Sequence, residues 1–318
     1  MTNWKPGAPA VMLAARADLL AQIRKFFAAR KVLEVETPIL ARATASDFHI
    51  QSWKTENSWG QNNQALYLQT SPEYAMKRLL ASGSGAIYQL GKAFRFEEIS
   101  DRHNPEFTLL EWYQPGYSLC QLMNEVEALV HLVTTVTDIR RFSYRELFQQ
   151  NLGIDPHQAL TDDLEQLVKS EISLVAQGLS RTDYLQLILS EIIEPAMQGN
   201  WFLYDYPEDQ AALAQVKLDA AGVKVAQRFE LFCSGMEIAN GYFELTDPVE
   251  QRRRFESDLD KRQQADRGLV PIDENLIAAL ESGLPDCAGV ALGVDRLLMI
   301  ATGAKRISEV ISFTTDLA

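Results

Sequence analysis

Apolar positions recur at helical spacing near the start of the chain and at strand spacing directly after it. Between residues 16 and 30 the apolar positions predict an amphipathic helix, and they are Leu19, Leu20, Ile23, Phe26 and Phe27. The next run, VLEVETPIL, alternates and contains Pro38, which predicts a strand that stops at the proline. A helix that leads into a strand fits an ordinary core and equally fits a subunit interface.

The run from residue 65 to residue 83, ALYLQTSPEYAMKRLLASG, changes from strand spacing to helical spacing. It predicts a strand to Gln69 and then a helix with Ser71 as N-cap, Pro72 at the first position and Gly83 at the end. Residues 86–96 and 107–113 alternate, and they predict two strands joined by a highly charged loop.

The second half of the chain mixes helical patterns with hairpin signals. Residues 117–225 are largely helical in pattern, interrupted by the strand-like WFLYDYP. FELFCSG and MEIANGYFEL predict a hairpin that turns at Ser234-Gly235, and a charged helix follows from about Pro248 to Arg267. GVALGVDRLLMIATGA predicts a buried strand and a final helix. Because regular βαβ alternation is missing, we expect an α+β domain with a mainly antiparallel sheet.

One face of the strand pair at 86–96 and 107–113 collects charged and aromatic side chains. Alternation gives that face Arg95, Glu97, Phe107, Glu111 and Tyr113. These residue types suit a nucleotide, since arginine binds phosphate in a fork, a ring stacks on a base and a carboxylate accepts an amine. They equally fit a solvated hairpin with surface ion pairs worth about 0–1 kcal/mol each. Alternation alone leaves both interpretations open.

Composition narrows the class of protein. The 318 residues are 47% hydrophobic and 23% charged, no apolar run approaches a membrane span of roughly 18 residues, and no signal peptide is visible. Three scattered cysteines and four histidines without metal-ligand spacing predict neither disulfides nor a zinc site, and they favour a cytoplasmic protein. A net charge of −13 disfavours stable nucleic-acid binding and favours a cationic substrate or basic partner.

Several motifs in order resemble class II aminoacyl-tRNA synthetases, in particular the lysyl type. FRFEE…RHNPEFTLLEWY resembles motif 2, GVALGVDR resembles motif 3 and VLEVETPIL resembles motif 1, while TSPE and FELF…MEIANGYFEL match lysyl-type segments. The resemblance covers residues 11–318, so we expect a loose leader at 1–10 and one class II catalytic domain after it. It implies ATP-dependent formation of an aminoacyl-adenylate, a step that depends on positioning and charge neutralisation.

The same resemblance assigns residues to ATP and magnesium. Arg95 would hold the α-phosphate and Arg296 the far side of the nucleotide, so both are predicted to be catalytic. Glu97 would read the adenine amino group and Phe107 would stack on the base. Further ATP contacts are predicted at His103, Asn104, Glu237, Ile238 and Gly293. Glu230 and Glu237 would hold Mg²⁺, a cation that prefers oxygen ligands.

Phe96 departs from the family pattern, because the related families usually have asparagine at this position. It still falls within the predicted ATP segment, where backbone contacts would remain possible. Alternation directs its side chain to the side of Phe94, away from the nucleotide. We therefore expect a packing change behind a working site.

The predicted amino-acid pocket is acidic. The resemblance assigns it Ser71, Pro72, Glu73, Glu111, Tyr113, Glu244 and Ala291. Glu73 would take the substrate's amino group, and Glu111 and Glu244 would pair with its side-chain ammonium, since a desolvated ammonium needs such partners. Glu73 would also fit a plain role beside the helix dipole. Glu237 and Glu244 are seven residues apart, so they share a face only if a bulge or turn lies near Asn240-Gly241.

The resemblance also bears on the acceptor, because we expect no anticodon-binding domain in this chain. Lysyl-tRNA synthetases carry an N-terminal domain that reads the anticodon, whereas this sequence starts almost at the catalytic core. HNPEFTLLEWY and PDCAGVALGVDR, with Ala291 in place of a glycine, are more similar to the elongation factor P–(R)-β-lysine ligase family. The resemblance implies a dimeric ligase that uses ATP and Mg²⁺ to attach lysine or (R)-β-lysine to a lysine of elongation factor P.

Three alternatives remain open from the sequence. The chain would otherwise be a lysyl-tRNA-synthetase-like enzyme that charges tRNA or a short RNA, a ligase for a small nucleophile, or an inactive regulatory relative. A lysine-type pocket disfavours the second alternative. The third is disfavoured because Arg95, Glu97, Glu237 and Arg296 are all retained.

Overall fold

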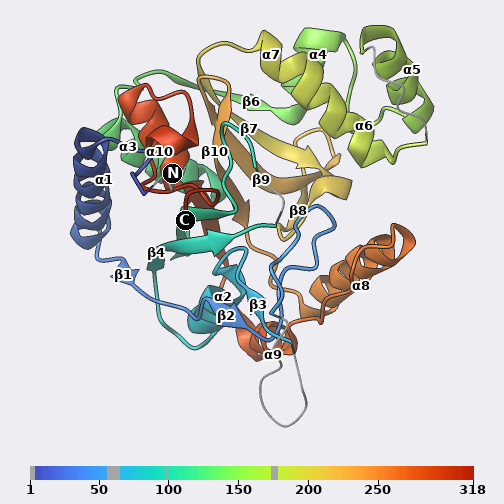
Figure 1. The fold of residues 1–318 in the computed structure, drawn as a ribbon. Helices are drawn as coiled ribbons and strands as arrows, with labels where there is room; N and C mark the ends of the chain where they lie inside the picture. Colours follow the sequence, from blue (N-terminus) through green and yellow to red (C-terminus); the bar gives the residue numbers. More distant parts are fainter. Residues whose placement is uncertain (1–3, 56–64, 97–98, 173–177) are drawn as a thin grey trace. The chain divides into compact units, whose positions relative to one another are not determined.

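The computed structural model describes residues 4–55, 65–96, 99–172 and 178–318, and the chain forms two compact units. Unit 1 comprises Met1–Thr135 together with Glu244–Ala318, and unit 2 comprises Val136–Phe243. The second unit is therefore inserted into the sequence of the first. The sequence analysis predicted one domain after the leader and gave no sign of this division. Figure 1 follows the chain through its helices and strands.

The sheet of unit 1 has the strand order β1 (Leu33–Glu34), β4 (Ile87–Phe94), β5 (Glu106–Pro115) and β11 (Cys287–Gly293). β1 runs parallel to β4, and the other neighbours are antiparallel. A separate pair consists of β2 (Leu40–Ala41) and β3 (Tyr67–Leu68). The strand predicted to stop at Pro38 is thus only two residues long, and a second short strand follows the proline, which has no N–H to donate to a ladder.

The helices of unit 1 are α1 (Ala10–Ala29), α2 (Glu73–Ala81), α3 (Leu119–Val133), α8 (Pro248–Gln264), α9 (Glu274–Gly283), α10 (Val294–Thr302) and the 3₁₀ turn η3 (Ile307–Glu309). α1 begins earlier than predicted, because the good helix formers between residues 10 and 15 extend it. α9 was not predicted. α2 begins one residue later than predicted, with Pro72 as N-cap, while the Ser71 hydroxyl accepts the Glu73 N–H at 3.0 Å.

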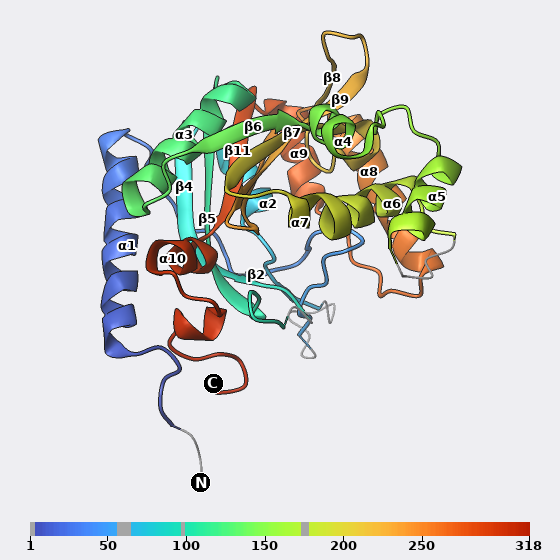
Figure 2. The same ribbon diagram turned by 90° about the horizontal axis from the view of Figure 1, so that it is seen from above.

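Side-chain alternation separates the two faces of the unit 1 sheet. Even-numbered side chains of β4 and β5 form the core face, where Phe27 of α1 stacks on Tyr88 at 4.4 Å and packs edge-on against Trp112 at 5.3 Å. The indole N–H of Trp112 donates to Glu125 of α3 at 2.9 Å. Figure 2 shows α1 on one side of β4 and β5 and α2 on the other. The odd-numbered side chains therefore face away from the α1 side.

Unit 2 has the strand order β10 (Met236–Phe243), β9 (Lys224–Cys233), β7 (Asn200–Pro207) and β6 (Ile139–Ser143), with β8 (Val216–Leu218) paired to β9. β6 and β7 are parallel and the remaining pairs are antiparallel. Its helical segments are α4 (Tyr144–Leu152), α5 (Thr161–Glu171), α6 (Arg181–Ile188), η1 (Leu189–Ile193), α7 (Glu194–Ala196) and η2 (Glu208–Gln210).

The predicted hairpin at Ser234-Gly235 is confirmed. Both turn residues have positive φ, 52° and 71°, as a two-residue hairpin turn of type I′ requires. β6 and β8 were not predicted. The hydrophobic core of this unit includes Trp201 and Phe232, whose rings stack at 4.1 Å.

The predicted fold class is confirmed, since helices accompany a mainly antiparallel arrangement of strands. Among the described residues, no helix is both long and apolar enough to cross a membrane. Cys120, Cys233 and Cys287 are all free thiols, as the sequence predicted.

Candidate functional site

The odd-numbered face of the unit 1 sheet brings the predicted substrate residues together. Glu111 of β5 lies opposite Gln89 of β4 on one side and Ala291 of β11 on the other. Tyr113, two residues on, lies opposite Gly289. The register confirms that positions 107, 111 and 113 share a face, because they differ by even numbers along one strand.

Glu111 is held by two hydroxyl groups in a nearly dry environment. The residue is 2% exposed, and its carboxylate accepts hydrogen bonds from the Ser71 hydroxyl at 2.7 Å and from the Tyr113 hydroxyl at 2.6 Å. Burial, reinforced by the nearby charge of Glu73, raises the pKa of Glu111 to about 7 in spite of these bonds. The residues predicted from TSPE and from motif 2 therefore meet around one carboxylate.

A buried lysine that the sequence analysis overlooked lies between the other two predicted carboxylates. The Lys77 ammonium is 2.7 Å from Glu73 and 2.6 Å from Glu244, and the side chains of Lys77 and Glu244 are each 1% exposed. Burial alone would lower the pKa of Lys77, but Glu244 and Glu73 outweigh that effect and raise it. Burial raises the pKa of Glu244 to about 8, with Lys77 opposing the rise. Glu73, Lys77, Glu111 and Glu244 are called the acidic cluster below.

Gly289 is a second residue that sequence reasoning missed. A Cβ atom at this position would lie 2.3 Å from Cε1 of Tyr113 and 2.5 Å from Oε1 of Glu244, distances that ordinary packing does not allow. Only glycine lets the tyrosine ring and the glutamate approach the strand so closely. The sequence signal for a close approach at this position is a glycine inside the buried strand pattern of GVALGVDR, in which only Ala291 and Gly293 were assigned to the site.

Two predicted ATP-binding side chains contact each other. The guanidinium of Arg95 lies over the ring of Phe107, 5.2 Å from its centroid. The backbone N–H of Arg95 donates to the Pro105 carbonyl at 2.9 Å. An arginine that stacks on a ring leaves its N–H edges directed sideways, which suits a phosphate neighbour. Glu97, which was predicted to read adenine, lies outside the described residues.

Phe96 packs against Trp53 rather than continuing a strand. β4 ends at Phe94, the Phe96 N–H donates to the Gln51 carbonyl at 2.8 Å, and the Phe96 ring meets the Trp53 ring edge-on at 4.8 Å. The alternation used to place Phe96 therefore stops before this residue. The aromatic contact accounts for a large side chain at this position.

Arg296 and His103 are in contact through a side-chain hydrogen bond, and His103 also bonds the Ser100 hydroxyl at 2.7 Å. Gly293 is the N-cap of α10, and a Cβ there would be 3.7 Å from Arg296, an ordinary contact. The protein's own packing thus does not require glycine at 293, unlike at 289. The predicted motif 2 and motif 3 residues His103 and Arg296 are nonetheless brought together.

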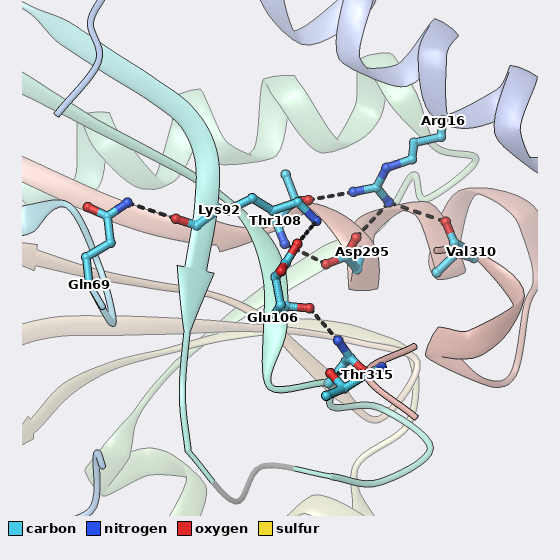
Figure 3. Close-up of polar contacts among 9 residues, drawn as sticks. Arg16, Gln69, Lys92, Glu106, Thr108, Asp295, Val310 and Thr315 are labelled. Carbon is cyan, nitrogen blue, oxygen red and sulfur yellow. Dashed lines mark hydrogen bonds and ion pairs between the residues drawn. The ribbon is translucent and has the colours of Figure 1, made fainter. Parts of the chain in front are cut away.

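Arg16 of α1 forms hydrogen bonds both to the start of α10 and to β5, as Figure 3 shows. Its guanidinium donates to Asp295 at 2.6 Å and to the Thr108 hydroxyl at 2.6 Å, while Asp295 accepts the Thr108 N–H at 2.8 Å. Asp295 is 2% exposed. This network holds the backbone next to Arg296, and the sequence analysis did not identify it because its members are far apart in the chain.

The predicted magnesium residues lie in unit 2. The β9–β10 register shifts between Glu237 and Ala239, so Glu237 lies opposite Phe232 while Asn240 lies opposite Glu230. Glu237 shares a face with Glu230 because Phe232 and Glu230 are two residues apart on β9. The bulge brings the later residue Asn240 onto that same face, which is the exchange of faces expected from a bulge near Asn240-Gly241. Ile238 is buried, so any contact to ATP would have to come from its backbone.

The donor chemistry at these two glutamates fits a magnesium ion that is also held by phosphates. Glu230 already accepts hydrogen bonds from Arg228 and, at 3.2 Å, from Asn240. Within the described ranges no cluster of three or more His, Cys, Asp or Glu side chains is arranged around a metal position. Mg²⁺ commonly needs only one or two carboxylates when substrate phosphates complete its shell.

Comparison with known proteins identifies close relatives. The family model for class II tRNA synthetases (D, K and N) matches residues 8–317. Proteins named elongation factor P–(R)-β-lysine ligase, from Yersinia pestis (strain Pestoides F) and Yersinia pseudotuberculosis serotype O:1b (strain IP 31758), are each 47% identical to this chain. The alignments cover 99% of this chain and 98% of each relative.

Proposed function

The chain belongs to the elongation factor P–(R)-β-lysine ligase family of class II tRNA synthetases, and from this premise we propose its activity. It activates (R)-β-lysine, or lysine, with ATP to form an aminoacyl-adenylate. It then transfers the aminoacyl group to a lysine side chain of elongation factor P. Family membership supports the reaction type, and the acidic cluster supports the substrate class.

The charge of the acidic cluster is the observation that carries the substrate assignment. The acidic cluster contains three carboxyl groups and one ammonium, that of Lys77, so full ionisation would give it a net charge of −2. Burial opposes that charge by raising the pKa of Glu111 and of Glu244. Buried charges are tolerated only when they are paired. An amino acid with two ammonium groups brings a cation to Glu73 and a second cation to Glu111 and Glu244 when these carboxyls ionise, whereas an amino acid with one ammonium brings no cation to the second position.

Each carboxylate of the acidic cluster retains capacity for a substrate, because an ionised carboxylate offers about four lone-pair sites. Glu73 is proposed to take the amino group near the reacting carboxylate, and Glu111 and Glu244 the distal ammonium. Tyr113 and Ser71 orient Glu111 through the two hydroxyl bonds described above. Pro72 is the N-cap of α2, and Ala291 lies opposite Glu111, where its methyl group shapes the site.

Arg95 and Phe107 are proposed to receive ATP. When the nucleotide binds, the guanidinium of Arg95 leaves the ring face and binds the α-phosphate, and the half-buried ring of Phe107 stacks on the adenine. Arg296, with His103 and Asn104, holds the remaining phosphates, and Gly293 lies at the N-terminus of α10, which favours anions. These groups stabilise the charge that develops as pyrophosphate departs.

Glu230, Glu237 and the backbone of Ile238 remain proposed for the Mg²⁺–ATP complex. A bound Mg²⁺ would neutralise phosphate charge in the adenylation step. The amine of the acceptor lysine then attacks the adenylate carbonyl and AMP leaves. We also expect a homodimer and a cytoplasmic location. Because this chain carries a net charge of −13, we expect the contact surface of the acceptor protein to be basic.

ATP–pyrophosphate exchange over a panel of amino acids that includes both lysine isomers tests the activation step. Transfer to purified elongation factor P and to tRNA then tests the acceptor. We expect exchange with a diamino acid and transfer to the protein, and exchange with no diamino acid would refute the activity. Transfer to tRNA instead would support the rival assignment as a lysyl-tRNA-synthetase-like enzyme.

Arg95→Ala tests the assignment of the α-phosphate contact. Loss of a charge-assisted contact to the reacting group should abolish exchange while circular dichroism and melting temperature stay near those of the wild type. A variant that still forms the adenylate at the wild-type rate would show that another group holds the α-phosphate.

A further inference from the structure

The side chain of Asn104 is fixed by the segment that follows α10. Asn104 is 7% exposed, and its amide nitrogen donates to the Glu106 carbonyl at 2.6 Å. Its amide oxygen accepts the Thr315 N–H at 3.1 Å and the Thr315 hydroxyl at 3.3 Å. Figure 3 shows Thr315 at the end of the loop that leads into β5, beside Glu106.

These partners permit only one orientation of the amide. A backbone N–H can only donate and a backbone carbonyl can only accept, so the oxygen of Asn104 must face Thr315 and its nitrogen must face Glu106. Both lone pairs of the oxygen are then used by Thr315. The nitrogen carries two hydrogens, and the bond to Glu106 uses one of them. The only further polar contact that this side chain can offer a ligand is therefore an N–H donor, which suits a phosphate oxygen.

The same C-terminal segment holds the loop at a second point. The Ile307 N–H, at the start of η3, donates to the Asp101 carbonyl at 2.7 Å. Residues 101 and 104 are thus both attached to the chain that follows α10. This loop also carries His103, which contacts Arg296.

We propose that Thr315 is a positioning residue for ATP, which fixes the Asn104 amide so that its N–H meets a phosphate oxygen. This proposal rests on the proposed function, because it deepens the assignment of Asn104 to the ATP site. Thr315 itself does not touch the nucleotide. Its effect is confined to ATP, since the amino-acid residues of the acidic cluster lie on α2, β5 and at Glu244.

The test uses two shortened chains. Ending the chain after Phe313 removes residues 314–318 and with them both Thr315 donors, whereas ending it after Thr315 removes only the mostly exposed residues 316–318 and keeps both donors. ATP dissociation constants are measured by calorimetry, and KM values for ATP and for the amino acid by pyrophosphate exchange. We expect the chain that ends at 313 to bind ATP about tenfold more weakly, with the amino-acid KM unchanged, and the chain that ends at 315 to match the wild type.

A purely structural role for Thr315 predicts a different result. The chain that ends at 313 would then melt at a lower temperature but keep its ATP affinity, or both KM values would rise together, and either outcome overturns the proposal. A wild-type chain that does not bind ATP would overturn the proposed function as well. Normal ATP binding by the wild type with an equal affinity in the chain that ends at 313 would overturn the positioning role alone.

A second measurement needs no variant. Because coupling between two sites is reciprocal, ATP should stabilise the hydrogen bond from the Thr315 N–H. Hydrogen exchange of the peptide that contains Thr315 should therefore slow when ATP is saturating. An exchange rate that is the same with and without ATP would contradict the proposal, even if the shortened chains do not fold.

Discussion

At the scale of single residues, the sequence predicted the three carboxylates of the pocket but not the lysine that pairs with two of them. Glu73, Glu111 and Glu244 were assigned by resemblance, and the structure places all of them near Lys77 or Ser71 and Tyr113. The spacing of Glu73 and Lys77 was visible as an i,i+4 pair, which usually indicates a surface contact worth a few tenths of a kcal/mol. The burial of Lys77 depends on its second partner, Glu244. Because Glu244 is far away in the sequence, this burial could not be predicted.

Lys77→Met should destabilise the protein by about 3–5 kcal/mol, because it leaves the buried Glu244 and the partly buried Glu73 without their cation. The matched control is Lys169→Met, which removes the exposed i,i+4 pair with Glu165 and should cost less than about 1 kcal/mol. Urea denaturation measures both unfolding free energies. Equal losses in the two variants would contradict the burial and pairing described for Lys77.

Binding of the amino acid should weaken as the pH falls. The pKa values of Glu111 and Glu244 are raised to about 7 and 8, chiefly by burial, so both carboxyls take up protons as the pH drops from about 8.5 to 6.5. The groups around them are Ser71 before α2, Glu73 and Lys77 on α2, Tyr113 on β5 and Cys287 on β11. An ammonium substrate must displace those protons. Calorimetry should therefore show a higher dissociation constant and more proton release at pH 6.5 than at pH 8.5, and a constant affinity would count against this.

The same raised pKa values affect stability in the absence of substrate. A carboxyl whose folded pKa lies above its unfolded value binds more protons in the folded state, so its contribution to stability falls as pH rises through that interval. Between about pH 5 and 8, Glu111 and Glu244 should thus lower the stability of the unliganded protein. Substrate should raise the melting temperature more at pH 8.5 than at pH 6.5.

At the scale of elements, alternation predicted which residues of β5 share a face, and it applies only as far as a strand is regular. Phe107, Glu111 and Tyr113 share a face because β5 is regular from Glu106 to Pro115. Phe96 lies beyond the end of β4, and the expected bulge in β10 lies between Glu237 and Ala239, two residues before Asn240. The end of a strand and the place of a bulge depend on neighbouring strands, which a single sequence does not reveal.

Arg16→Met should remove the ion pair that links α1 to α10, the helix that carries Arg296. Asp295 would lose its buried cation, which predicts a loss of about 3 kcal/mol in unfolding free energy. Arg24→Met, in the same helix, removes only the exposed pair with Glu34 and is expected to cost less than about 1 kcal/mol. Chemical denaturation of both variants checks this, and a small effect at Arg16 would show that Thr108 alone satisfies Asp295.

At the scale of the whole molecule, the fold class followed from the sequence, but the division into two units did not. The order of helices and hairpins predicted an α+β protein, and the family comparison agrees. Unit 2 begins and ends without a glycine- or proline-rich linker, since its last strand continues directly into Glu244. No change in composition marks such a boundary. Each unit is defined by its internal contacts, which only the structure supplies.

The acidic cluster is proposed to select a substrate with two ammonium groups. Pyrophosphate exchange by the wild type should compare (R)-β-lysine with the same molecule lacking only its side-chain ammonium. Leaving a buried carboxylate unpaired costs several kcal/mol, so kcat/KM should differ by on the order of 100-fold or more in favour of the diamino acid. Equal kcat/KM values for the two compounds would contradict the account.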